Sequence, residues 1–124
     1  RDLSLWKQKI RENWAGIRIL RIDAEKEGPF TVGETVKVTA LINLGNLSPS
    51  DVSVELYTGG VDASGSLYDA KPLAMEWTGQ KLKGQVFEGR LTLTKSGKSG
   101  YSLRVLPSHP DMFPAQDLML IKWA

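Results

Sequence analysis

The sequence has no cysteine and only one histidine among its 124 residues. Without a thiol, the chain can form no disulfide, no thiolate metal site and no cysteine nucleophile. A catalytic triad or a histidine-containing metal site would therefore have to use His109. This residue lies in an expected proline-rich loop, and its neighbours Ser108 and Asp111 would point in different directions on an extended chain. We interpret His109 as a loop residue without a catalytic or metal-binding role.

The chain also lacks a strong charge of either sign and a long apolar run. Its 16 basic and 14 acidic residues leave a formal net charge of +2, which is too small for the positive field of a typical nucleic-acid-binding domain. No apolar segment reaches the roughly 18–20 residues that a membrane-spanning helix needs, and the first residues do not resemble a secretory signal. We therefore expect no nucleic-acid partner and no membrane partner, with the cytoplasm as the default compartment.

What the chain does contain is typical of one folded domain. It is 41% hydrophobic and 24% charged, which is the composition of an ordinary globular protein. A chain of 124 residues can enclose one hydrophobic core but not two. Because the sequence begins at Arg1 without an initiator methionine, we expect it to be a segment of a longer protein.

The first residues have the pattern of an amphipathic helix. Apolar residues recur at helical spacing among charged ones, at Leu3, Trp6, Ile10 and Trp14. Gly16 is a typical signal for the end of such a helix. Two tryptophans on one stripe must be buried, either against the rest of the domain or against an absent neighbour. We therefore take Trp6, Ile10 and Trp14 as candidate interdomain contacts.

From residue 17 onward, apolar residues alternate with polar ones at the period of half-buried strands. Turn-forming Gly, Pro, Asn and Ser separate these short segments, and no long helix lies between them, which indicates an all-β fold. We predict an immunoglobulin-like or fibronectin-III-like antiparallel β-sandwich of about seven strands with one short N-terminal helix. The expected strands lie at residues 17–22, 34–44, 52–56, 73–77, 85–93, 101–105 and 117–123.

Two of the connections have recognisable signals. The glycines at 59, 60 and 65 predict a flexible loop, because glycine tolerates the positive φ that turns require. Residues 95–99 predict a hairpin between the two strands that flank them.

The last expected strand differs from the others because Leu118–Ile121 is apolar on both faces. Such a strand is either covered on its outer side by the helix or in contact with a partner domain. We take Ile121 and Trp123 as further candidate interdomain contacts.

No motif in the chain assembles a recognisable catalytic site. Gly97-Lys98-Ser99 resembles the end of a phosphate-binding loop, but Thr92 stands where that motif requires glycine, and we interpret the segment as a turn. The carboxylates are scattered over turns and polar strand positions. A glycosidase pair can come from any two positions of a chain, so that alternative stays open, although surface positions suit these charges equally well.

The aromatic residues suggest a sugar-binding alternative. A β-sandwich can present Tyr or Trp rings on which the C–H faces of pyranose rings stack. Tyr57 and Tyr68 lie on or beside strand ends, and we take them as candidate glucan-stacking residues. Trp77 has the same parity as Leu73 and Met75, so we expect it in the core.

Four blocks of the sequence, in order, resemble the C-terminal domain of bacterial and archaeal α-glucan phosphorylases that carry long additional domains. The likeness covers almost the whole chain, and the order and spacing of the blocks make it more specific than any block alone. The blocks are Trp6-Lys-Gln-Lys-Ile-Arg-Glu-Asn-Trp14, Leu44-Gly-Asn-Leu-Ser-Pro-Ser-Asp-Val52, Val54-Glu-Leu-Tyr-Thr-Gly59, and Gly100-Tyr-Ser-Leu-Arg-Val-Leu-Pro107 with His109-Pro110 and the closing Trp123-Ala124.

The resemblance implies a division of labour. Enzymes of that family use pyridoxal 5′-phosphate to move a glucosyl unit from an α-1,4-glucan to phosphate, in a region upstream of the terminal sandwich. Nothing in this chain resembles the cofactor lysine or the phosphate-binding residues, so the resemblance carries no catalytic, cofactor-binding or metal residue over to it. Residues 1–15 would be the linker helix from an absent catalytic region, and residues 16–124 a non-catalytic accessory sandwich that packs on that region.

Two other functions stay open at this point. One is a carbohydrate-binding module for glycogen or maltodextrin, which would use Tyr57 or Tyr68. The other is a stand-alone β-sandwich that binds another protein.

Overall fold

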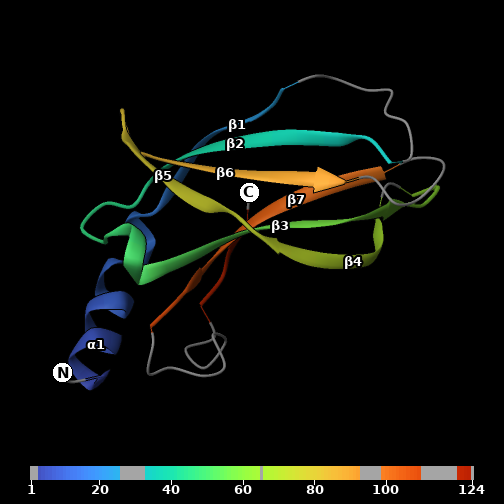
Figure 1. Cartoon of the computed structure of the whole chain (residues 1–124). Coiled ribbons are helices and arrows are strands. Elements are labelled where there is room, and N and C mark those ends of the chain that lie inside the picture. The colour runs from blue at the N-terminus through green and yellow to red at the C-terminus, as the bar shows by residue number, and fades with distance from the viewer. Residues whose placement is uncertain (1–2, 26–32, 65, 93–98, 110–119, 124) are drawn as a thin grey trace.

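The computed structural model describes residues 3–25, 33–64, 66–92, 99–109 and 120–123 of the protein. One α-helix and a set of β-strands make up most of these residues (Figure 1). The elements are α1 (Leu3–Asn13), the 3₁₀ turn η1 (Trp14–Gly16), β1 (Arg18–Ala24), β2 (Thr35–Asn43), the 3₁₀ turn η2 (Pro49–Asp51), β3 (Val52–Val61), β4 (Leu67–Ala74), β5 (Glu76–Lys81), β6 (Gln85–Thr92), β7 (Ser99–Pro107) and β8 (Lys122–Trp123).

The strands form two four-stranded sheets, with the orders β1-β2-β6-β5 and β4-β3-β7-β8. Every paired strand runs antiparallel to its neighbour. The two sheets lie one above the other in Figure 1, and α1 stands at one end of the sandwich. The predicted all-β sandwich with a short N-terminal helix is therefore confirmed, with eight strands among the described residues where about seven were expected.

In β2, the alternation of apolar and polar residues in the sequence matches an alternation of buried and more exposed side chains. Its residues Val36, Val38, Ala40 and Ile42 are all buried, whereas Lys37 and Thr39 between them are only half-buried. Because side chains of a strand point alternately to its two faces, one face of β2 lines the core and the other faces outward. The strand lies between β1 and β6, so its backbone is paired on both sides.

One predicted strand proves to be two strands in different sheets. Residues on either side of Met75 belong to β4 in one sheet and to β5 in the other, and the Met75 backbone N–H donates to the Val54 carbonyl at 2.8 Å where the chain crosses. The alternation of inward-facing and outward-facing side chains is therefore not continuous from β4 into β5. The expectation that Trp77 is a core residue is consequently wrong, because Trp77 lies on the edge strand β5 and is 49% exposed.

Two predicted connections are also wrong. Gly59 and Gly60 do not lie in a loop, because β3 continues to Val61 and both glycines pair with β7. The link from β6 to β7 is not a hairpin, because β6 pairs with β2 and β5 whereas β7 pairs with β3 and β8 in the other sheet. Most of that link, residues 93–98, lies outside the described part of the chain, as does the glycine-lysine segment compared above with a phosphate-binding loop.

The helix and the sandwich share one hydrophobic core. Its members come from the inner faces of both sheets and from the apolar stripe of α1 and η1. Because this stripe packs into the core, the position of α1 is fixed by this chain itself. Within the described ranges, α1 is not long and apolar enough to cross a membrane.

Candidate functional site

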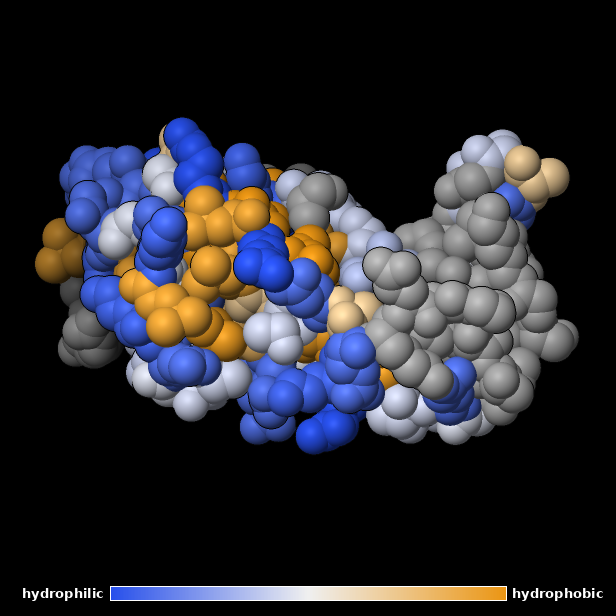
Figure 2. Space-filling view, turned by 90° about the horizontal axis from the view of Figure 1, so that it is seen from above, coloured by the Kyte–Doolittle hydropathy of each residue, from blue (hydrophilic) through white to orange (hydrophobic). Residues whose placement is uncertain are grey.

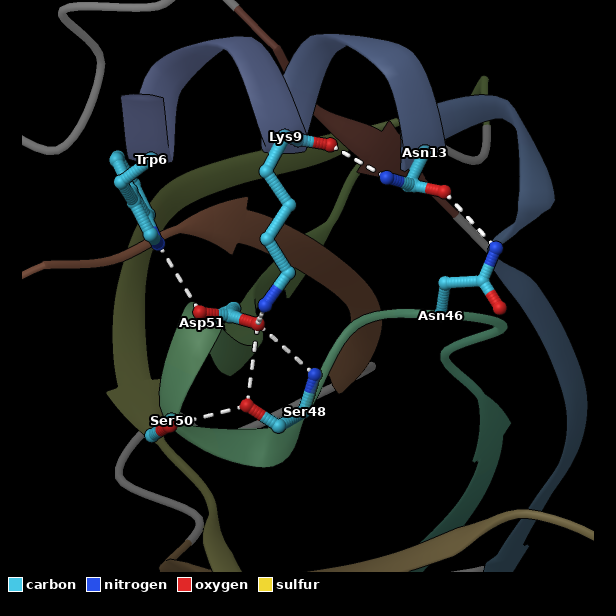
Figure 3. A network of polar contacts seen from close by, with 7 residues as sticks. All are labelled: Trp6, Lys9, Asn13, Asn46, Ser48, Ser50 and Asp51. Atoms are coloured by element: carbon cyan, nitrogen blue, oxygen red, sulfur yellow. Dashed lines mark hydrogen bonds and ion pairs between the residues drawn. The ribbon is translucent and has the colours of Figure 1, made fainter. Parts of the chain in front are cut away.

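The junction between α1 and the sandwich is built around Asp51, a carboxylate that is almost fully buried (Figure 3). The indole N–H of Trp6 donates to its Oδ1 at 3.0 Å, and the Lys9 ammonium lies 3.2 Å from its Oδ2. Ser48 donates to Oδ2 from both its backbone N–H, at 2.9 Å, and its hydroxyl, at 3.1 Å. Two residues of the helix and the turn η2 are thus joined through one carboxylate.

These hydrogen bonds determine the charge of Asp51. Burial alone would raise the pKa of its carboxyl group, but the bonds from the Ser48 backbone, the Trp6 indole and the Lys9 side chain outweigh burial and hold the pKa below its ordinary value. The carboxylate is therefore ionised at neutral pH. Since donors already surround it, Asp51 acts as a structural acceptor and is poorly suited to transfer protons.

The structure corrects the expectation for the helix stripe. Trp6, Ile10 and Trp14 are all buried in the core of this chain, so they leave no open stripe for a neighbouring domain. The ring of Trp6 also contacts the ring of His109, with centroids 4.8 Å apart, which places the single histidine at the junction. The indole N–H of Trp14 is buried without a hydrogen-bond partner among the described residues.

A second polar cluster lies on the outer face of the sheet that contains β3, β7 and β8. Glu55, Arg104 and Trp123 are successive partners across these three strands. The Arg104 Nε lies 2.8 Å from Glu55 Oε1, and both side chains are largely covered, with 14% and 19% exposed. The Arg104 guanidinium also lies 4.7 Å from the centre of the Tyr57 ring and 5.7 Å from that of Trp123.

This outer cluster brings together two residues that were predicted for different roles. The rings of Tyr57 and Trp123 meet edge to face, with centroids 5.8 Å apart and planes at 69°. Arg104 lies over one face of Tyr57, so Trp123, which is 47% exposed, presents the more accessible ring. The side chain of Tyr68 lies outside what the structure describes. Glucan stacking by either tyrosine stays a prediction, as does interdomain contact by Ile121 and Trp123.

Beside Trp123, the side of the sandwich between β1 and β8 is hollowed. An open groove of about 430 Å³ is lined by Arg18–Ile22 of β1 and by Lys122 and Trp123 of β8. We call this hollow the β1–β8 groove. Its lining mixes aliphatic side chains, one indole and three cationic side chains.

Neither cluster has the composition of a catalytic centre. Among the residues with described positions, no group of three or more His, Asp or Glu side chains could hold a metal ion. Glu55 is paired with Arg104 and Asp51 is surrounded by donors, so neither is placed to act as a general base. What the outer cluster can do is bind a flat or apolar surface through Trp123 and a hydrogen-bonding group through Arg104.

Sequence reasoning missed Asp51 and Arg104, although both have a local signal. Ser48 and Asp51 are three residues apart, which is the spacing of a capping box at the start of a helical turn. Glu55 and Arg104 are opposite charges on polar positions of strands that became neighbours only in the fold. The first signal was readable in the sequence, whereas the second required the pairing of β3 with β7.

The fold and these clusters define a β-sandwich domain whose described residues assemble no catalytic constellation. Comparison of sequences then identifies its family. The sequence model for the glycogen phosphorylase C-terminal domain matches residues 14–124, so the chain belongs to that family.

Named relatives agree with this assignment. The chain is 32% identical to glycogen phosphorylase of Mycobacterium tuberculosis over 127 residues, which cover all of this chain and 15% of the relative. It is 34% identical to maltodextrin phosphorylase of Thermococcus litoralis over 130 residues, which cover 99% of this chain and 14% of the relative. The chain thus corresponds to about a seventh of the length of these proteins. No solved structure matches it significantly.

Proposed function

We propose that this chain is the non-catalytic C-terminal accessory domain of an α-glucan phosphorylase, and that it packs on the catalytic region of the same polypeptide. The parent protein would be a glycosyltransferase that moves glucosyl units from an α-1,4-glucan to phosphate, in the cytoplasm. The names of the relatives and the match to a C-terminal domain family support this proposal. The observation that carries the non-catalytic role is the state of Asp51, the buried carboxylate, whose oxygens are occupied by structural hydrogen bonds.

Pyridoxal phosphate, the cofactor that we expect in the parent enzyme, finds no suitable lysine among the described residues of this chain. Its attachment requires a lysine whose amine is desolvated in a closed site. Each lysine whose burial is described is exposed or only half-buried, including Lys9 and Lys122. We therefore propose that the cofactor and its lysine belong to the region of the parent enzyme outside this chain.

The test separates the role of this chain from that of the whole enzyme. The full-length phosphorylase is expected to release glucose 1-phosphate from maltoheptaose and phosphate, and the isolated chain is expected to release none above a blank. In the full-length enzyme, His109→Ala and Arg104→Ala should leave kcat within about threefold, because neither residue touches the reacting atoms. Release by the isolated chain, or a loss of kcat of about a hundredfold in a folded variant, would refute the non-catalytic role.

One observation favours a second function, the binding of glucan. Trp123 is 47% exposed and lies beside Tyr57 and Arg104, a combination that can stack on a sugar ring and donate to its hydroxyls. Electrophoresis of the protein through a gel containing glycogen tests it, with Trp123→Ala as the variant. Trp77→Ala is the matched control, because Trp77 is similarly exposed on β5 at the other edge. Unretarded migration of the unmodified protein would rule this function out.

A further inference from the structure

The sandwich leaves apolar side chains uncovered on one side, at the β1–β8 groove. Leu20 on β1 and Trp123 on β8 are 46% and 47% exposed, and Ile121, two residues before Trp123, is 40% exposed. Ile19 and Ile22 lie in the floor of the same groove and are half-buried. Contiguous apolar surface of this kind usually marks a place where another surface is bound.

Apolar side chains also lie on the outer face of the sheet that contains β1. Leu41 of β2 lies between Arg21 of β1 and Val86 of β6 in the ladder, so Leu41 and Val86 are neighbours on this face, where Leu41 is half-buried and Val86 is buried. The register of β1 shifts between Ile19 and Arg21, and Leu20 falls in that bulge. Figure 2 looks onto this face and shows apolar side chains gathered on the side nearer α1, with hydrophilic side chains around them.

The charges at the rim of the groove are mostly positive. Arg18, Arg21 and Lys122 line it, and the only carboxylate paired with them is that of Asp23, 2.6 Å from the Arg21 Nε, among the residues whose contacts are described. Arg18 already donates from its Nη1 to the backbone carbonyls of Ala15 and Ile17, so Lys122 is the lining cation that has no partner among the described residues. A surface that covers the groove is therefore expected to combine apolar side chains with a carboxylate near Lys122, and a neutral glucan would leave both the aliphatic lining and Lys122 without a complementary partner.

The length of the relatives and the position of α1 indicate which part of the polypeptide would cover the groove. In the relatives, about six-sevenths of the polypeptide lies outside the region matched by this chain, which matches a C-terminal domain family. In a longer polypeptide of the proposed kind, the residues before Leu3 would enter through α1, which the Asp51 network fixes to the sandwich. After α1, only the turn η1 and Ile17 separate the helix from Arg18, the first residue of the groove. The entering polypeptide is thus held at the end of the sandwich where the groove begins.

We infer that the β1–β8 groove and the adjoining face around Leu20 are the surface on which the catalytic region of the same polypeptide docks. The inference rests on the proposed function and adds to it the surface and the chemistry of the contact. Interfaces between domains of one chain bury about 600–1,500 Å², so the docking surface would include the neighbouring face of β1 and β2 as well as the groove. The part of the catalytic region in contact carries aliphatic side chains at the centre and Asp or Glu at the margin.

Photo-crosslinking in the full-length phosphorylase tests this contact directly. We would replace Leu20 by p-benzoylphenylalanine, which forms a covalent bond to whatever it touches on illumination. Because Leu20 is exposed, the replacement disturbs the fold little. The expected product keeps the mass of a single polypeptide chain, and mass spectrometry places the crosslink on a peptide that precedes Leu3. The matched control is Leu82, which is 62% exposed between β5 and β6, and it should give only the background of an unilluminated sample.

A charge substitution tests the chemistry of the same contact. Lys122→Glu should reduce the Leu20 crosslink to the catalytic region severalfold, whereas Lys83→Glu near the control position should leave it unchanged. Lys122 belongs to no catalytic group, so glucose 1-phosphate release provides a check that the enzyme remains folded. An unchanged crosslink in Lys122→Glu would refute the acidic margin of the partner surface.

Each of the remaining outcomes would overturn either the inference or the proposed function. A product of doubled mass would show that a second copy occupies the groove and would overturn the inference. Background crosslinking at Leu20, combined with protection of β8 amides from hydrogen exchange by maltoheptaose, would assign the groove to glucan instead. Either result leaves the proposed function standing. Glucose 1-phosphate release by the isolated chain would refute the proposed function, whatever the crosslinks show.

Discussion

Two regions at the same end of the molecule contrast in how they treat large apolar side chains. At the helix junction, Trp6 and Ile10 are buried, and the polar edge of Trp6 is hydrogen-bonded to Asp51. At the β1–β8 groove, Leu20 and Trp123 remain about half exposed. The junction is complete within this chain, whereas the apolar side chains of the groove are not covered to a comparable degree by any residue that the structure describes.

The contrast indicates which contact this domain lacks. An amphipathic helix at the start of a domain invites the interpretation that its stripe binds a neighbour, but here the stripe completes the core of the sandwich. The exposed apolar side chains of the groove, by contrast, are on the edge strands β1 and β8, where pairing ends and cover must come from outside. A terminal helix can therefore act as the fixed attachment of a domain while a different surface makes the docking contact.

The largest expected effect is a difference in unfolding free energy between substitutions in the two regions. Ile10→Ala removes a fully buried side chain and leaves a cavity, so the free energy of unfolding should fall by about 2–5 kcal/mol. Leu20→Ala removes a side chain of equal size from an exposed bulge and should change it by less than about 0.5 kcal/mol. Chemical denaturation of the protein measures both. A similar loss in the two variants would mean that the groove is already closed.

The next largest effect concerns the polar part of the junction. Asp51→Ala leaves the Trp6 indole, Lys9 and the Ser48 backbone without their acceptor, and should cost about 3 kcal/mol of unfolding free energy. Ser50→Ala is the control, because its hydroxyl makes only an exposed contact with the Ser48 hydroxyl and its loss should be within about 0.5 kcal/mol. Thermal unfolding of the three proteins compares them. Equal midpoints would show that the Asp51 network does not hold the helix.

Elements whose residue pattern is local in the sequence could be predicted, whereas features that depend on pairing between distant segments could not. The helix at residues 3–13 and the strand β2 followed from periodicity alone, because their partners did not alter which faces were apolar. Trp77 was misplaced because the chain changes sheets at Met75, and no local signal marks that crossing. The glycines at 59 and 60 suggested a loop, but pairing with β7 keeps them in β3.

The candidate site was predictable only in part for the same reason. Tyr57 was predicted as a glucan-stacking residue and Trp123 as an interdomain contact, but the contact between their rings depends on β7 lying between β3 and β8. Arg104, which links them, looked like an ordinary polar position until that pairing placed it opposite Glu55. The burial of the helix stripe was left open between two alternatives, and only the packed core decided it.

A smaller effect should distinguish the two tryptophans of the helix junction. Trp6→Phe removes an indole N–H that donates to Asp51, whereas Trp14→Phe removes one that is buried without a partner in the described structure. Both variants lose part of a buried ring, and this shared loss of packing cancels when their unfolding free energies are compared. Trp6→Phe should therefore be the less stable by about 1–2 kcal/mol in denaturant titrations. The opposite order would mean that the Trp14 N–H has an acceptor.

The smallest effect is a pH dependence with a defined sign. Because the junction lowers the pKa of Asp51 below its ordinary value of 3.8, ionised Asp51 favours the folded state. The contribution is complete above this value and is lost as the pH falls through the still lower pKa of the folded protein. The difference in unfolding free energy between the protein and Asp51→Asn should therefore be constant from neutral pH down to about pH 5 and shrink below about pH 4. Other carboxylates titrate in both proteins and largely cancel. A difference that grows on acidification would reverse the sign of the shift and would mean that Asp51 is protonated in the folded junction.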